Sequence, residues 1–321
     1  MPLSNPIKLF IRKLLWLAML FLTVHLLLVF AIPPDHNHYL CEYNHKISLL
    51  QQVPQPRVVL MGGSNTAFGI NSRRLADSLH RHVVNFGLHA GIGMRYPMED
   101  ALQYLRRGDV VVLQIEYSHF FEEACNAETM PKQMAATGWR HAWQLTANEW
   151  QAVLAGASGL ALGNLKRLLL YPLRHSMDSP PSTDHFTYVA SGFNEYGDEV
   201  SHLSFPSSEY HPNGYREERS VRPSFCEWLQ HIVTAYREKG VHVLMMPPAC
   251  TSSYFATHYN EQVAETLRAK RIPYIVSPTE MVVPDSCYFD SGYHFNRHGV
   301  ELNTTRLSWH FSQIHLKKGT K

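Results

Sequence analysis

Apolar residues near the start of the chain form one long continuous run. From 14 to 32 the sequence reads LLWLAMLFLTVHLLLVFAI, interrupted only by Thr23 and His25. A helix rises about 1.5 Å per residue, so this run nearly matches a hydrocarbon core of about 30 Å. We therefore predict one transmembrane helix over 14–32.

Positive charges lie on the amino side of this run. Lys8, Arg12 and Lys13 precede it, and the positive-inside rule then keeps residues 1–13 in the cytoplasm and places everything after Ile32 on the other side. A cleaved signal peptide is the alternative interpretation. Its apolar region is usually shorter, about 7–15 residues, and no small-x-small cleavage site stands before the prolines that follow. The pattern favours an uncleaved signal anchor.

Beyond a polar linker over 33–56, short apolar runs alternate with amphipathic stretches up to about residue 316. Such alternation is typical of an α/β fold with a mostly parallel sheet and right-handed crossovers. The run at 110–116 is continuously apolar at its start, as expected for a strand that is buried on both faces. The predicted strands are 58–61, 83–87, 110–116, 241–246 and 274–276, and the predicted helices are 71–82, 96–107, 224–239 and 260–270.

The pattern loosens between about 122 and 222, which we interpret as an insertion in the domain over 57–316. Tryptophans and leucines from 139 to 173 predict amphipathic helix. This helix either packs in the core or presents its apolar side to a membrane surface or a partner. Residues 176–215 are rich in Ser, Pro, Gly, His and Tyr and are predicted to form a long loop over the functional edge of the sheet.

A glycine turn follows the first predicted strand. Gly62 and Gly63 permit a sharp bend, and Ser64 comes directly after them, ahead of the helix predicted at 71–82. The Ser64 hydroxyl would then stand at the carboxyl end of a strand, where open α/β sheets place their chemistry. The alternative is that Ser64 only caps the following helix.

A second segment with candidate catalytic residues lies near the end of the chain. Asp290 and His294 are four residues apart in a stretch rich in turn residues. A serine hydroxyl is a poor nucleophile until a base removes its proton, and an imidazole oriented by a carboxylate is the usual base. The pattern predicts Ser64 as nucleophile, His294 as general base and Asp290 as its orienting acid, with His298 as a rival base.

Composition argues against several other classes of protein. The formal net charge is +2, so the sequence shows no broad basic field for a nucleic acid. The 20 histidines are scattered, without a His-x-Glu-x-x-His helix or paired Cys-x-x-Cys motifs, so we expect neither a metal nor another cofactor. The five cysteines are too few for a disulfide scaffold, but a bridge between Cys250 and Cys287 stays open.

The motif GGSN at 62–65, together with Asp-x-x-x-His at 290–294, resembles the SGNH (GDSL-type) hydrolase superfamily over most of 57–311. The resemblance implies a three-layer α/β/α domain that transfers acyl groups through an acyl-serine. It also implies an oxyanion hole built from the backbone N–H of the nucleophile and that of Gly87 or Gly91. One departure is the spacing of acid and base, which in the superfamily is usually Asp-x-x-His.

A second departure concerns the oxyanion hole. The Gly-x-Asn-Asp block that the superfamily carries after its third strand is missing, and Gln114-Ile-Glu116 stands there instead. Each lost donor of an oxyanion hole costs about 10²–10³ in rate. Asn65 and Gln114 are candidates for the missing donor, although Asn65 is equally suited to a turn. Glu116 either faces the substrate or pairs with a nearby Arg.

The chain further resembles bacterial single-pass SGNH-like proteins that accompany membrane-bound O-acyltransferases, among them those of lipoteichoic acid D-alanylation and alginate acetylation. This resemblance implies a bacterial inner-membrane protein whose main domain lies in the periplasm or outside the cell. It implies an esterase or O-acyltransferase that acts on an envelope or exported glycan. The alternative is a non-catalytic accessory protein that binds a glycan or an O-acyltransferase. The implied partners are an acylated carbohydrate or acyl donor and a membrane-bound O-acyltransferase.

Overall fold

The computed structural model describes residues 5–122, 125–140, 142–174, 187–209 and 220–314. The chain divides into two compact units. The first consists of Met1–Asp35 and Asn126–Pro180, and the second of His36–Cys125 and Pro181–Lys321.

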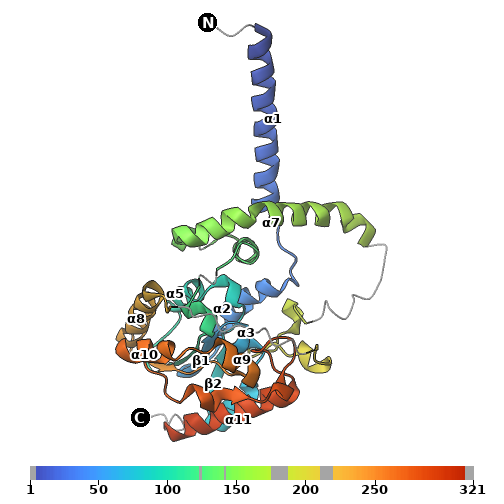
Figure 1. Cartoon of the computed structure of the whole chain (residues 1–321). Helices are drawn as coiled ribbons and strands as arrows, with labels where there is room; N and C mark the ends of the chain where they lie inside the picture. Colours follow the sequence, from blue (N-terminus) through green and yellow to red (C-terminus); the bar gives the residue numbers. More distant parts are fainter. Residues whose placement is uncertain (1–4, 123–124, 141, 175–186, 210–219, 315–321) are drawn as a thin grey trace. The chain divides into compact units, whose positions relative to one another are not determined.

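A four-stranded parallel sheet forms the centre of the second unit (Figure 1). The strand order is β2-β1-β3-β4, and every residue of β1 and β3 is buried because helices pack on the sheet. An α/β fold with a mostly parallel sheet is thus confirmed. The strands are β1 (Arg57–Gly62), β2 (His82–Asn85), β3 (Val110–Gln114) and β4 (His242–Met245).

Two sets of helices contact the sheet. Leu75 of α4 and Leu307 of α11 pack with Val58 of β1 in one core cluster. Tyr236 of α8 donates to the Met98 carbonyl of α5 at 2.6 Å and contacts Met61 of β1 with its hydroxyl. The helices of this unit are α2 (Glu42–Gln52), α3 (Ser64–Ala67), α4 (Ser72–Leu79), α5 (Arg95–Ala101), α8 (Pro223–Glu238), α9 (Ser252–His258), α10 (Glu261–Ala269) and α11 (Arg297–Gln313).

The structure differs from the expected elements at three places. Residues 274–276 are not a strand: only Tyr274 forms a bridge, to Met245, because Pro273 and Pro278 bracket the segment and lack the N–H that a ladder needs. A separate two-stranded sheet pairs β5 (Cys250–Thr251) with β6 (Val282–Val283). The predicted linker over 33–56 contains α2, whose Tyr43 and Leu50 are buried on one side.

Short 3-10 turns make up most of the remaining regular structure of the described residues. The predicted loop over 176–215 is described only at 187–209, and there it holds two such turns; the rest lies outside the described residues. All five cysteines are free thiols in the structure, so no bridge joins Cys250 to Cys287. The 3-10 turns are η1 (Tyr39–Cys41), η2 (Ala90–Ile92), η3 (Tyr117–Phe120), η4 (Ala142–Gln144), η6 (Ala190–Gly192), η7 (Ser201–Ser204), η8 (Pro278–Met281) and η9 (Asp285–Cys287).

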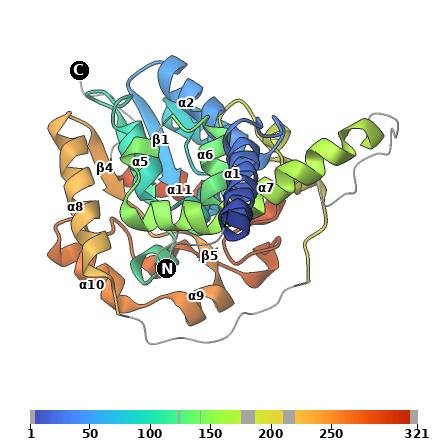
Figure 2. The same cartoon turned by 90° about the horizontal axis from the view of Figure 1, so that it is seen from above.

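The first unit contains α1 (Asn5–Phe30), α6 (Met130–Ala136) and α7 (Ala147–Arg174). Figure 2 looks down α1 and shows α7 passing across its end. The Asn164 amide of α7 donates to the Leu28 carbonyl at 2.8 Å, and the Phe30 and Trp139 rings lie 4.5 Å apart. Among the described residues, α1 and α7 are long and apolar enough to cross a membrane by length and composition alone.

A buried carboxylate ties the end of β2 to the start of α4. Asp198 accepts hydrogen bonds from the Ser72 N–H at 2.8 Å, the Ser72 hydroxyl at 2.5 Å and the Asn85 amide at 2.8 Å. Burial raises the pKa of Asp198, and the hydrogen bonds from Ser72 and Asn85 offset part of that rise. The Asn85 carbonyl in turn accepts from the Lys46 ammonium at 3.0 Å.

We expect Asp198→Ala to lower the free energy of unfolding by about 3 kcal/mol, because it leaves several buried donors without an acceptor. Chemical denaturation of the purified full chain, followed by tryptophan fluorescence, measures the change. Glu195→Ala is the matched control, since Glu195 is exposed in the same loop, and it should stay within about 0.5 kcal/mol of the unmodified chain. Equal effects of the two substitutions would contradict the structural role of Asp198.

Candidate active site

Strand pairing brings Ser64 and Glu116 side by side. Gly62 of β1 is the register partner of Gln114 of β3, and in this parallel pair the chain runs two residues further to Ser64 and to Glu116. The Ser64 hydroxyl donates to Glu116 Oε1 at 3.4 Å, and the Asn65 N–H donates to the same oxygen at 3.2 Å. The predicted glycine turn therefore presents its serine to a buried carboxyl.

Gly63 allows this close approach. A Cβ at Gly63 would lie 2.5 Å from Glu116 Oε1 and 3.2 Å from the Ala90 nitrogen, so any larger residue would displace one of them. The Ala90 N–H makes no hydrogen bond with the described residues. Among the described residues, Ala90 is thus an unpaired backbone donor near the turn, and no sequence pattern predicts it.

Ser64 does not cap the following helix. Ser64 is itself the first residue of α3, and no side-chain hydrogen bond caps that helix. The cap of α4 is Asn71, whose side chain accepts from the Arg74 N–H at 3.0 Å. The capping interpretation of Ser64 therefore fails, because Asn71 performs that role.

A tight turn joins Asp290 to His294. The His294 N–H donates to the Ser291 carbonyl at 3.0 Å, and the Phe289 N–H donates to the His294 carbonyl at 2.9 Å. His294 Nδ1 lies 2.6 Å from Asp290 Oδ1. If Asp290 is ionised, Nδ1 carries the proton and Nε2 is left to accept one. The four-residue spacing thus gives the geometry that an orienting acid needs.

Tyr188 completes the hydrogen bonds of this acid. Its hydroxyl donates to Asp290 Oδ2 at 2.5 Å and lies 3.4 Å from His294 Nδ1. Burial alone would raise the pKa of the Asp290 carboxyl, but the hydrogen bonds from His294 and Tyr188 outweigh burial and lower that pKa. Asp290 is therefore an anion at neutral pH. Tyr188 lies in the predicted loop, and no sequence pattern had marked it.

Stacking fixes the plane of the His294 ring. The Phe68 ring lies parallel to it, with centroids 4.2 Å apart and an angle of 14° between the planes. His294 is 7% exposed and Phe68 is fully buried. His298, the rival base, lies exposed in the first turn of α11. The structure thus joins His294, and not His298, to Asp290.

Glu116 connects the two halves of the site. Its side chain is buried, and a charge on His294 acts on it electrostatically. Burial raises the pKa of the Glu116 carboxyl, and the hydrogen bond from Asn65, the charge of His294 and the hydrogen bonds from Ser64 offset only part of that rise. Among the described residues, no Arg or Lys forms an ion pair with Glu116. No hydrogen bond joins the described residues Ser64 and His294 in this structure.

The two glycines expected in the oxyanion hole have their N–H groups engaged. The Gly87 N–H donates to Asn85 Oδ1 at 3.0 Å, and the Gly91 N–H donates to His89 Nδ1 at 2.9 Å. A Cβ at Gly87 would lie 2.5 Å from the Thr66 Cβ. In this structure, the missing side chain of Gly87 lets its backbone pack closely against Thr66.

Of the two amide side chains expected as donors, that of Asn65 is engaged elsewhere and that of Gln114 is buried. The Asn65 side chain donates to the Gln114 carbonyl at 2.9 Å and so ties the turn to the end of β3. Gln114 is 1% exposed, and its Oε1 is buried without a hydrogen-bond partner. Among the described residues, no group of three His, Cys, Asp or Glu side chains is arranged to hold a metal ion.

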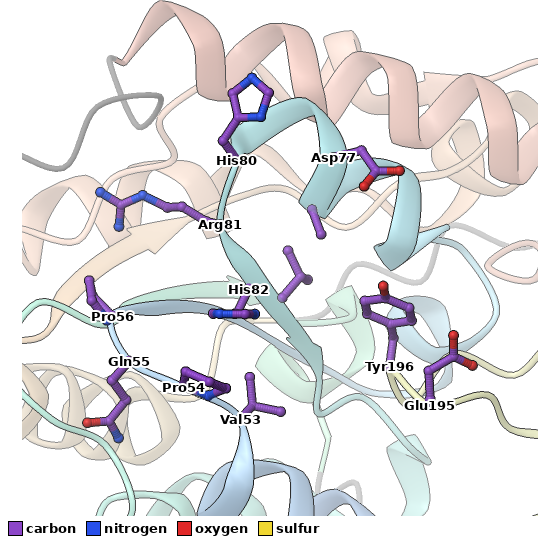
Figure 3. Close-up of a pocket in the computed structure, with 12 residues that line it drawn as sticks. Val53, Pro54, Gln55, Pro56, Asp77, His80, Arg81, His82, Glu195 and Tyr196 are labelled. Carbon is purple, nitrogen blue, oxygen red and sulfur yellow. The ribbon is translucent and has the colours of Figure 1, made fainter.

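A pocket of about 680 Å³ lies at the end of the sheet opposite to Ser64 (Figure 3). Gln55 and Pro56, directly before β1, line it together with the turn from His80 to His82 that leads into β2. In a parallel sheet these are the amino ends of the strands, whereas Ser64 follows the carboxyl end of β1. The pocket is therefore separate from the serine site.

Comparison of the sequence with models of known protein families found no match, and comparison with curated proteins found none either.

We expect Gly87→Ala to lower the free energy of unfolding by about 2 kcal/mol, because its methyl group would overlap the side chain of Thr66. Gly159→Ala is the control: nothing lies within 4 Å of a Cβ there, and alanine in a helix should stabilise by up to about 1 kcal/mol. Thermal unfolding of the full chain in detergent compares the two. A neutral Gly87→Ala would contradict the packing role.

Proposed function

We propose that the chain is a membrane-anchored serine esterase or O-acyltransferase that acts on acyl groups of an envelope or exported glycan. The observation that supports the proposal most is the hydrogen bond between Asp290 and His294. Glu116 links this pair to Ser64, because it accepts a hydrogen bond from Ser64 and is acted on by the charge of His294. Nucleophile, base and orienting acid come from segments more than 220 residues apart in the sequence. A scaffold without catalytic activity has no need to bring these groups together.

An SGNH-like three-layer arrangement is part of the proposal. The contacts of α4 and α11 with Val58 of β1, and of α8 with Met61 of the same strand, support it. Ser64 leaves the sheet at the carboxyl end of β1, where a serine hydrolase of this kind carries its nucleophile.

The reaction proceeds by two acyl transfers. Ser64 Oγ attacks the acyl carbon while its proton passes to His294 Nε2, and Asp290 stabilises the imidazolium that forms. The C–O bond to the leaving alcohol then breaks, and the alcohol takes the proton from His294. Water or a sugar hydroxyl attacks the acyl-serine by the reverse path. Because Ser64 donates to Glu116 in the structure, its hydroxyl must first turn toward His294.

The proposed location is a bacterial inner membrane, with the second unit in the periplasm or outside the cell. The length and apolar character of α1 support an anchor. Three basic residues, Lys8, Arg12 and Lys13, lie at its amino end and support this orientation.

We expect Ser64→Ala and His294→Ala each to lower kcat/KM for a nitrophenyl acyl ester by at least about 10³-fold, because each removes a member of one catalytic unit. The assay uses the purified full chain in detergent. His298→Ala is the matched control and should keep the rate within about twofold, since His298 is exposed and lies outside the pair. An unchanged rate in Ser64→Ala would refute the proposal that the chain is an enzyme with Ser64 as nucleophile.

The second candidate function is an accessory protein that binds a membrane-bound O-acyltransferase. A row of exposed leucines on α7 favours it. Spacings of 8, 3 and 4 residues place their side chains along one side of the helix. The row consists of Leu154, Leu162, Leu165 and Leu169, which are 69%, 53%, 39% and 67% exposed.

For this second function we expect co-purification with a co-expressed membrane-bound O-acyltransferase to survive Ser64→Ala and to be lost in the double substitution Leu162→Asp and Leu165→Asp. A charge on this side of α7 would remove the apolar contact. Gly163→Asp is the control, because Gly163 is exposed on a different side of the same helix and nothing lies within 4 Å of a Cβ there. If the unmodified chain retains no acyltransferase in mild detergent, the accessory function loses its support.

A further inference from the structure

The Glu116 carboxyl lies where a reacting acyl group would place its negative charge. In the tetrahedral intermediate the oxyanion is bonded to the carbon that Ser64 Oγ attacks, so it forms close to that oxygen and to the N–H groups at the start of α3. Glu116 Oε1 is 3.4 Å from Ser64 Oγ and 3.2 Å from the Asn65 nitrogen, and it also interacts with the Ser64 N–H. An ionised Glu116 would therefore repel the oxyanion.

We infer that Glu116 works as a neutral carboxylic acid that donates a hydrogen bond to the oxyanion, in the role of the asparagine that the chain lacks. The inference rests on the proposed acyl transfer at Ser64. As the carbonyl C=O bond opens, its electron pair moves to the oxygen, which becomes the oxyanion. Three donors around the turn can then donate hydrogen bonds to this oxyanion: the Glu116 O–H, the Ser64 N–H and the unpaired Ala90 N–H. The proton stays on Glu116 throughout, and Ser64 gives its own proton to His294.

The surroundings of Glu116 favour the neutral form. Glu116 is 5% exposed as a whole residue, and removing a carboxylate from water without a cation partner is costly. Among the described residues, the titratable groups that act on it or feel its charge are His294, Tyr39, Tyr254 and Tyr293. Of these, only His294 can carry a positive charge, and as the general base it must be neutral before the reaction starts.

The pH dependence follows from this arrangement. Burial raises the pKa of Glu116, so the protonated form persists to higher pH than for an exposed glutamate. Activity is present below that pKa and is lost as the pH rises through it. Glutamine has the shape of the neutral acid and donates from its amide at every pH, so it should remove this alkaline loss.

The test compares Glu116→Gln with Glu116→Ala in the full chain. We expect Glu116→Gln to keep kcat/KM within about tenfold, whereas Glu116→Ala should fall by about 10²–10³-fold, the effect of removing one oxyanion donor. The alkaline loss of activity should disappear in Glu116→Gln. If both variants fall by the same large factor, Glu116 is needed as a base. If both become faster, its carboxylate blocks the site. Either result overturns the inference.

A spectroscopic measurement keeps the inference testable without turnover. The infrared difference spectrum between the unmodified chain and Glu116→Gln at neutral pH should contain the C=O band of one protonated carboxyl. Carboxylate bands in its place would overturn the inference. Ser64→Ala, assayed in parallel, separates the role of Glu116 from the proposed function: full activity in that variant refutes the proposed function, whatever the state of Glu116.

Discussion

The pairing of Gly62 with Gln114 across β1 and β3 is the constraint on which the site depends. Both strands end at this pair, so the register alone decides that Ser64 and Glu116 become neighbours. A slip of one residue would turn the buried residues of β3 to the other face of the sheet and move Glu116 away from Ser64. Side chains buried on both faces of β1 and β3 make that slip costly.

Much of the fold could be predicted because its strands are short apolar runs between turn signals. The strands predicted from 58, 83, 110 and 241 all form, since each can be buried as a continuous run. The segment 274–276 looks the same in sequence but lies between two prolines. The pair β5 and β6 has two residues per strand and depends on tertiary contact, which leaves no periodic signal.

The site was predictable only where chemistry and local pattern coincide. Asp290 and His294 sit in one turn, so their spacing carries the signal. Tyr188 and Phe68 reach the same pair from segments more than 100 residues away, and nothing local marks them. Glu116 was visible as a residue at the end of a strand, but its neighbours depend on strand register. Glu116 is buried without a cation partner among the described residues, and a sequence alone does not show that.

In the proposed reaction, Ser64 is a nucleophile that His294 activates. Covalent labelling of the full chain with a fluorophosphonate, followed by mass spectrometry of the peptides, tests it most directly. We expect a phosphonyl adduct on Ser64 that forms much more slowly in His294→Ala. An unmodified Ser64, or an adduct that forms equally fast without the imidazole, would contradict it.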